Sequence, residues 1–305
     1  MSGAPLVSVV MSVYNGLPSL GETLGSVLNQ DDCDFEFNVI NDGSRDGSGA
    51  CLDEYARRDE RLRVVHQENT GLTRALIRGC ALAKGEFIAR QDAGDFSLPG
   101  RLAEQAAFLS EHREVVAVAS RIRFVAPDGE WLFDSESPAN IEVTLDANSI
   151  KLPPLVGAMF RRDAYLRAGG FRPEFVVAQD VDLWLRLLEQ GPCLGLAAAH
   201  YETRLNVSGI SSRLRPEQLR FCALAVECAK RRTLGESDQS LLNTVAAAPR
   251  VNSSVTGKDK ARFYYFVGAC LHRNNRPAAR RYYSRALSNN PFHIKALVRY
   301  LFGRR

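Results

Sequence analysis

Three short acidic segments, each at the end of an apolar run, carry the residue types best suited to chemistry. Asp42, the pair Asp92 and Asp95, and Asp180 each follow residues typical of a buried strand or its end. In an open α/β sheet, the carboxyl ends of the strands line one crevice in which ligands bind. We therefore expect these carboxylates to converge at a site that suits ribose hydroxyls, a divalent metal ion and a general base.

The elements that must position these carboxylates alternate between strand and helix. Continuous apolar and β-branched runs predict strands, and apolar residues at helical spacing predict the helices between them. The expected strands cover residues 6–13, 35–40, 62–65, 86–90 and 115–119, and the expected helices cover 18–29, 44–58, 70–83 and 99–112. This alternation with short loops predicts a mostly parallel, doubly wound α/β sheet flanked by helices.

The pattern changes after residue 120. Residues 122–125 and 131–133 flank a turn sequence and predict a hairpin, and strands at 156–160 and 194–199 flank a helix at 179–190. Beyond Pro216 only helical patterns follow, so we place a boundary near 214, between a domain of residues 1–214 and a helical region of residues 215–305. Within that region, residues 261–301 resemble one tetratricopeptide-like hairpin, which we expect to pack on the domain because a single copy cannot stack.

Composition sets the broad class of the protein. Apolar residues make up 45% of the 305 and charged residues 24%, which is ordinary for a soluble globular chain. The longest apolar runs are too short to span a bilayer, and the first residues lack a signal-peptide pattern, so we expect a cytoplasmic protein. Seven cysteines without metal-ligand spacing are expected to be reduced.

The charge is distributed unevenly along the chain. Residues 251–305 hold twelve basic groups and one acidic group, Asp259, a net charge of +11 in a chain whose total is +4. A basic segment rich in aromatics suggests an anionic partner such as the inner surface of a membrane. The alternative is an ordinary solvated helical surface, and the sequence leaves both open.

The motifs of residues 5–213, taken in order, resemble the family-2 inverting glycosyltransferases of the GT-A fold. The segments that carry the resemblance are Ser8–Asn15, Asn41–Ser48, Asn69–Thr73, Gly85–Asp92, Phe160–Arg162, Gly169–Arg172 and Gln179–Leu187. Each one is weak by itself, but their order and spacing together are specific. The resemblance implies a Rossmann-like sheet and the transfer of a hexosyl or deoxyhexosyl group from a nucleotide-diphosphate donor.

The resemblance also implies which residues bind the donor nucleotide. Family members use the aspartate that matches Asp42 to accept a hydrogen bond from the base, and an ionised carboxylate suits the imide N–H of uracil or thymine. The donor would then be a UDP or dTDP sugar. The alternative is that Asp42 only caps a helix or stabilises a turn. The nucleotide-binding residues implied are Val13, Asn15, Asp42, Asn69, Arg74 and Asp92.

Two departures from the family pattern concern the metal ion. Asp92 matches the first carboxylate of the DxD motif, but the third position is Gly94, which leaves Asp95 as the implied ligand and Asp92 as a second candidate. Asn206 occupies the place of a metal-binding histidine. The resemblance still implies Mg²⁺ or Mn²⁺, because a diphosphate leaving group needs charge neutralisation, with Arg204 as a substitute cation.

Asp180 matches the catalytic base of the family, which removes the proton of the acceptor hydroxyl. The alternative is a simple N-cap of the helix that follows it. Uncharged Gln179 precedes it where relatives often carry glutamate. The residues implied to contact the acceptor or the diphosphate are Gly157, Gln179, Trp184 and Arg204.

The sequence thus predicts an inverting glycosyltransferase that acts on a hydroxyl acceptor, a cell-surface or exported glycan on a lipid carrier, with no nucleic acid as partner. A contrasting hypothesis is a degenerate module that binds the nucleotide but transfers no sugar, and it is motivated by Gly94, Gln179 and Asn206. A nucleotidyltransferase is disfavoured because no Gly-rich phosphate loop with Arg or Lys lies near the N-terminus.

Overall fold

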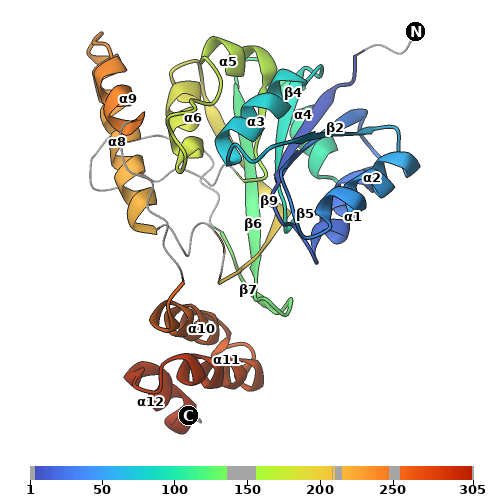
Figure 1. The fold of residues 1–305 in the computed structure, drawn as a ribbon. Helices are drawn as coiled ribbons and strands as arrows, with labels where there is room; N and C mark the ends of the chain where they lie inside the picture. Colours follow the sequence, from blue (N-terminus) through green and yellow to red (C-terminus); the bar gives the residue numbers. More distant parts are fainter. Residues whose placement is uncertain (1–3, 136–155, 208, 210–214, 247–254, 304–305) are drawn as a thin grey trace. The chain divides into compact units, whose positions relative to one another are not determined.

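The computed structural model describes residues 4–135, 156–207, 209, 215–246 and 255–303 (Figure 1). Within these residues nine strands form one sheet in the order β3-β2-β1-β4-β8-β6-β9-β5, with β7 paired to β6. The strands are β1 (Val7–Val13), β2 (Phe35–Asp42), β3 (Leu62–Gln67), β4 (Phe87–Asp92), β5 (Asp95–Ser97), β6 (Ala117–Val125), β7 (Trp131–Asp134), β8 (Met159–Arg161) and β9 (Cys193–Arg204).

The helices follow the strands in alternation and then dominate the last third of the chain. The helices are α1 (Leu20–Leu28), α2 (Ser48–Arg58), α3 (Leu72–Ala81), α4 (Arg101–Glu111), α5 (Arg162–Arg167), α6 (Gln179–Leu188), α8 (Arg215–Thr233), α9 (Gln239–Ala246), α10 (Gly257–Leu271), α11 (Arg276–Asn289) and α12 (Ile294–Phe302). Among them, α5 was not expected from the sequence. The expected start of a helix at residue 44 was wrong, because residues 43–47 form the turn between β2 and α2.

The predicted α/β sheet is confirmed, and its first half is wholly parallel. Strands β3, β2, β1 and β4 pair in parallel, and β1 lies between β2 and β4. Beyond β4 the sheet becomes mixed, since β8 pairs antiparallel with both β4 and β6. The expected strand at 115–119 and the first hairpin strand are one continuous strand, β6, which bends into an antiparallel pair with β7.

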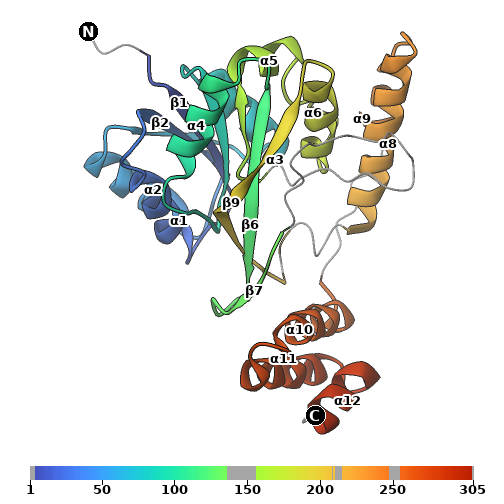
Figure 2. The ribbon, with the colours of Figure 1, turned by 180° about the vertical axis from the view of Figure 1, so that it is seen from behind.

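Side chains of the parallel strands alternate between two cores, one on each face of the sheet. On β1, Val9 and Met11 face a core that contains residues of α1, α2 and α4, whereas Val10 faces one with residues of α3, α5 and α6. These helices lie on the two faces of the sheet in Figures 1 and 2. Both faces are buried, which is why these strands read as continuous apolar runs in the sequence.

The described residues divide into two compact units that interleave along the chain. The first holds residues 4–122, 156–203 and 219–246, and the second holds 123–135, 204–207, 209, 215–218 and 255–303. A single boundary near 214, which itself lies outside the described residues, does not describe this division. The hairpin of residues 123–135 groups with the C-terminal helices, and most of α8 and all of α9 group with the sheet.

Side-chain packing explains the interleaving. In the second unit, Ala126 and Leu132 of the hairpin share a core with Val267 of α10 and with Tyr282 and Tyr283 of α11. The hydroxyl of Tyr282 donates to the Asp128 carboxylate at 2.7 Å, so the turn is also held by a polar contact. The helical hairpin expected at 261–301 is present as α10 and α11, and it packs on this β-hairpin.

In the first unit, a buried charge network ties α6 to α9. The carboxylate of Asp182, only 1% exposed, accepts hydrogen bonds from Arg172 at 2.7 and 3.1 Å and from Arg186 at 2.6 and 3.2 Å. Arg172 in turn donates to Asp238, just before α9, at 2.7 Å, and Asp238 also binds Arg232 of α8. Asp182 therefore has a structural role.

We expect Asp182→Ala to lower the free energy of unfolding by about 3–5 kcal/mol, because it leaves buried arginines without their counter-charge. Asp163→Ala is the matched control, since Asp163 forms an exposed i,i+4 pair with Arg167 and should contribute less than about 1 kcal/mol. Urea unfolding of both variants measures the difference. Equal losses would show that burial of the Asp182 network adds nothing to stability.

Candidate active site

The ends of the four parallel strands meet at one edge of the sheet. Ser12 pairs with Ile40 on one side and with Asp92 on the other, and Asp42 pairs with Gln67. The structure therefore brings together the C-terminal ends of β1, β2, β3 and β4, which carry most of the residues expected at the nucleotide. This is the edge at which α/β proteins of this kind bind ligands.

Asp42 is almost completely buried, and its carboxylate holds the start of α3. Oδ1 accepts hydrogen bonds from the Thr70 amide at 2.8 Å and from the Gln67 side chain at 2.7 Å, while Oδ2 accepts from the Gly71 amide at 2.8 Å. Asn69 adds a bond from its side chain to the Asp42 carbonyl oxygen at 2.9 Å. Asp42 thus stabilises this turn, and its role toward a base stays a prediction.

The loop after β1 is tied to the loop after β2. Asn15, at φ +52°, accepts a hydrogen bond from the Arg45 amide at 2.8 Å and donates its own amide to Ser44 at 3.0 Å. Asp46 lies just before the N-cap of α2 and joins the two loops, because its carboxylate accepts hydrogen bonds from the amides of Ser48 and Leu17, each at 3.0 Å. Backbone and side chains are thus fixed where the nucleotide is expected.

Arg90 is the residue at this edge that sequence reasoning missed. Its guanidinium is nearly fully buried and forms two parallel hydrogen bonds to Asp92, with Nε and Nη2 each 3.1 Å from a carboxylate oxygen. Burial lowers the pKa of Arg90, but the charges of Asp92 and Asp180 outweigh it and raise the pKa overall. The charge of the buried Arg90 therefore interacts with the carboxylates of both Asp92 and Asp180. The signal available in the sequence was an arginine inside a predicted strand, between the acidic motifs of Asp42 and Asp92.

Asp95 lies in a different environment from Asp92. It is 8% exposed, pairs across the sheet with Thr203 and accepts a hydrogen bond from the hydroxyl of that residue at 3.2 Å. Burial and, next to it, the charge of Asp92 raise the pKa of Asp95 well above its ordinary value. The Asp95 carboxyl group therefore keeps its proton to a higher pH than an exposed aspartate does.

Asp92 fits a metal ion better than Asp95 does. Its side chain is 29% exposed, and each of its oxygens keeps a lone pair beyond the hydrogen bond to Arg90. Magnesium and manganese sites of this kind use one or two carboxylates, with water and substrate phosphates completing the shell. Within the described part of the chain, no group of three or more His, Cys, Asp or Glu side chains could enclose an ion.

The glycine in the third position of the acidic motif has a conformational reason. Gly94 has φ +95°, in the region that side chains disfavour, and its amide donates to Thr23 at 3.1 Å. The turn between β4 and β5 therefore requires a glycine here, and the departure from DxD follows from backbone geometry.

Asp180 lies at the start of α6, where the chain turns sharply. Ala178, the N-cap, has φ +54°, and Gln179 beside Asp180 is buried. Asp180 is half-buried and uses one oxygen to accept from the amide of Val181 at 3.0 Å. Trp184, one turn further on, is 1% exposed and packs in the core with Leu183, so its surroundings are those of a core residue.

A second buried arginine supports the turn that carries Asp92 and Asp95. Arg101, fully buried, donates to the Gln91 side chain at 2.9 Å, to the Ser97 hydroxyl at 2.7 Å and to the Arg90 carbonyl at 2.6 Å. This network fixes β4 against β5. The role of Arg101 could not be predicted from the sequence, because its contacts come from residues on separate strands.

Tyr201 connects the acidic turn with the segment before β8. Its hydroxyl accepts a hydrogen bond from the Asp92 amide at 3.0 Å. A Cβ on Gly157 would come within 2.5 Å of the Tyr201 ring, and Gly157 has φ +70°, so only glycine fits there. Gly157 is buried, and its carbonyl accepts from Gln105 at 2.8 Å, which indicates a packing role.

Two of the expected site residues, Arg74 and Arg204, are not among the residues described above at the strand ends. Arg74 is exposed on α3, within the first unit. Arg204, the last residue of β9, and Asn206 belong to the second unit. Val13, by contrast, is fully buried at the end of β1, so only its backbone could reach a ligand.

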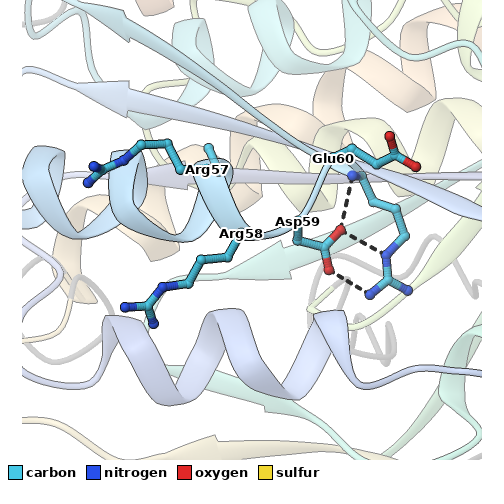
Figure 3. Close-up of a pocket in the computed structure, with 6 residues that line it drawn as sticks. Arg57, Arg58, Asp59 and Glu60 are labelled. Atoms are coloured by element: carbon cyan, nitrogen blue, oxygen red, sulfur yellow. Dashed lines mark hydrogen bonds and ion pairs between the residues drawn. The ribbon is translucent and has the colours of Figure 1, made fainter.

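A hollow of about 520 Å³ lies at the opposite end of the strands, between α2 and β3 (Figure 3). Residues 56–61 line it, and the carboxylate of Asp59 holds the Arg61 guanidinium there at 2.7 and 3.0 Å. Arg61 also stacks on Phe35 and donates to the Leu28 carbonyl, so its role is to fix this turn. None of the acidic motifs borders this hollow.

The comparisons with known proteins agree with this geometry. The family profile described as "Glycosyl transferase family 2" matches residues 8–167, just over half of the chain. The chain belongs to glycosyltransferase family 2. The resemblance seen in the sequence is thereby confirmed.

Relatives and solved structures support the family and its fold. This glycosyltransferase is 28% identical to EpsE of Bacillus subtilis, covering 78% of this chain and 87% of EpsE. It is 30% identical to the O-antigen biosynthesis glycosyltransferase WbnJ of Escherichia coli, covering 61% of this chain and 73% of WbnJ. A crystal structure of S. aureus TarS in complex with UDP superposes with a TM-score of 0.59 at 20% identity, over 93% of this chain and 88% of that one. The family-2 glycosyltransferase described here therefore has the GT-A fold.

We expect Asp95→Asn to stabilise this glycosyltransferase at pH 7 but not near pH 4. An aspartate whose pKa is raised on folding costs stability as the pH rises above its ordinary value of 3.8, because the unfolded chain then loses the proton more readily. Asparagine removes that penalty and can still accept from Thr203. Thermal unfolding at the two pH values measures the effect, and a loss of stability at pH 7 would contradict it.

Proposed function

We propose that this glycosyltransferase moves a hexosyl or deoxyhexosyl group, with inversion, from a UDP or dTDP sugar to a hydroxyl of a glycan, with Asp180 as the general base. The observation that carries the proposal is the buried Arg90 guanidinium, which interacts with Asp92 on the donor side and with Asp180. Crystal structures of TarS with UDP and with UDP-GlcNAc support a uridine donor, on the same fold.

In the proposed reaction, the oxygen of the acceptor hydroxyl attacks the anomeric carbon of the donor sugar. One oxygen of Asp180 takes the proton of that hydroxyl during the attack. The new C–O bond forms as the bond to the diphosphate breaks, and the nucleotide diphosphate leaves with the electron pair. Arg90 contributes positive charge close to both carboxylates. Among the described residues its Nη1 has no hydrogen-bond partner, so a buried donor remains for a substrate oxygen.

A divalent ion would add positive charge at the leaving diphosphate when bound. Asp92 and Asp95 would hold it, and Asp92 is the more exposed of the two. Mg²⁺ or Mn²⁺ therefore stays part of the proposal, with these two carboxylates as its candidate protein ligands.

The acceptor we propose is a cell-surface or exported glycan on a lipid carrier, reached from the cytoplasmic side of the membrane. The O-antigen biosynthesis named for WbnJ, which is 30% identical over 196 residues, supports a glycan acceptor. No helix of the described residues is long and apolar enough to cross a membrane. The contrasting hypothesis, a module that binds nucleotide without transfer, predicts no slow hydrolysis of a donor sugar when no acceptor is present.

We expect Asp180→Asn to lower the transfer rate by about 10²–10⁴-fold, because the amide cannot accept the hydroxyl proton. The affinity for UDP, measured by calorimetry, should stay within about twofold of the wild type, since the proposed role of Asp180 is on the acceptor side. Asp163→Asn, on the exposed pair with Arg167, is the control for a surface charge change. Near-wild-type turnover of Asp180→Asn would remove Asp180 from the mechanism.

We expect Asp42→Asn to weaken UDP binding about tenfold or more while pyrophosphate binding changes little. The proposed contact is between the Asp42 Oδ2 atom, which accepts from Gly71 and keeps another lone pair, and the imide N–H of the base. Asparagine is chosen because its one oxygen can still accept from the Thr70 amide, whereas alanine would remove the hydrogen bonds of both Thr70 and Gly71. Calorimetric titration with each ligand provides the comparison. Equal losses for both ligands would show that Asp42 acts only through the turn.

A further inference from the structure

The last helix, α12, exposes a continuous apolar face. Its exposed apolar residues follow the spacing i, i+3, i+4, i+7, i+8, which places them on one side of a helix. They are Ile294, Leu297, Val298, Leu301 and Phe302, with exposed fractions of 74%, 41%, 49%, 51% and 74%. Phe292, just before the helix, is 89% exposed. So many large apolar side chains on one short helix indicate an interaction surface.

The other side of α12 is held by the second unit, so the apolar face is fixed outward. Ala296 is fully buried, and the Tyr300 ring lies 4.8 Å from the guanidinium of Arg280 on α11. The His293 ring, which caps α12 by accepting from the Ala296 amide, lies 5.0 Å from Tyr265 of α10. The helix therefore docks through one face and leaves the apolar one uncovered by the described residues.

Basic side chains border this face and acidic ones do not. Lys295 and Arg299 are exposed on α12, one helical turn apart and beside the apolar positions. Residues 251–305 carry a net charge of +11 with Asp259 as the single acid. A helix with an apolar face and basic flanks is typical of segments that lie in the interface of an anionic membrane.

Charge also argues against a second copy as the occupant. Pairing this face with itself would bring two segments of charge +11 together, and like charges at close range oppose association. An anionic surface, in contrast, gains from each basic residue near it. The aromatic residues of the segment form two groups. Tyr282 and Tyr283 are buried in the unit, whereas Phe292 and Phe302 are exposed.

We propose that α12 is a membrane-docking helix, which inserts its apolar face among the acyl chains of an anionic leaflet while Lys295 and Arg299 contact the headgroups. The proposal does not depend on the transferase chemistry, because its residues belong to the second unit. It identifies the element by which the enzyme would stay near an acceptor on a lipid carrier.

Vesicle flotation of the full chain tests this directly. We expect binding to vesicles that contain phosphatidylglycerol, weaker binding at high salt because the charges are screened, and little binding to phosphatidylcholine alone. The double variant Ile294→Ser/Leu301→Ser should lose about tenfold or more of the affinity. Lys295→Gln/Arg299→Gln should lose about tenfold on anionic vesicles only.

The matched control is Leu219→Ser/Leu234→Ser, which removes two leucines that are 62% and 74% exposed in the first unit. This variant should bind vesicles like the wild type, and all variants should keep wild-type thermal unfolding and hydrolysis of a UDP sugar. If Ile294→Ser/Leu301→Ser unfolds, Phe302→Ser at the end of the helix replaces it.

Three results would overturn the proposal. The first is that the wild type binds no vesicle, the second is that it binds regardless of lipid charge and salt, and the third is that light scattering shows a dimer that the α12 variants convert to monomer. The last result would assign the face to a second copy of the chain. Absence of UDP-sugar hydrolysis in the wild type, by contrast, would contradict the proposed function and leave the vesicle result standing.

Discussion

Arg90 carries a charge that is almost entirely removed from water, and the arrangement of the site follows from how that charge is balanced. An isolated buried guanidinium is strongly unfavourable, whereas one held by a bidentate carboxylate is tolerated. Asp92 supplies that partner at 3.1 Å through both of its oxygens, and the charge of Asp180 acts on the same group. The side chains of Arg90 and Asp92 are thus held together at the end of β4.

The turn around Arg90 is built so that this pair cannot move apart easily. Arg101 binds the carbonyl of Arg90 and the side chains of Gln91 and Ser97, all buried. Gly94 supplies the backbone conformation that lets β5 follow β4 after two residues. This geometry disfavours an acidic side chain at position 94, since only glycine adopts it readily.

The second unit has a separate physical basis. Its core consists of aromatic and aliphatic residues from a β-hairpin and from α10 and α11, and it holds α12 through Ala296 and Tyr300. The hairpin that starts this unit is inserted in the chain between strands of the sheet. Strands β6 and β9 each begin in the first unit and end in the second.

The sequence by itself determined the family, the α/β class, the parallel half of the sheet and the identity of the acidic strand ends. These features depend on local runs of apolar residues and on motifs whose order is visible along the chain. What only the tertiary structure decided depends on contacts between distant residues. Arg90 and Arg101 gain their hydrogen-bond partners from β4 and β5 together, and Asp95 pairs with Thr203, which lies over a hundred positions away in the sequence. The exposed face of α12 was likewise hidden in the sequence, because its spacing is that of any core helix, and only packing shows which side remains uncovered.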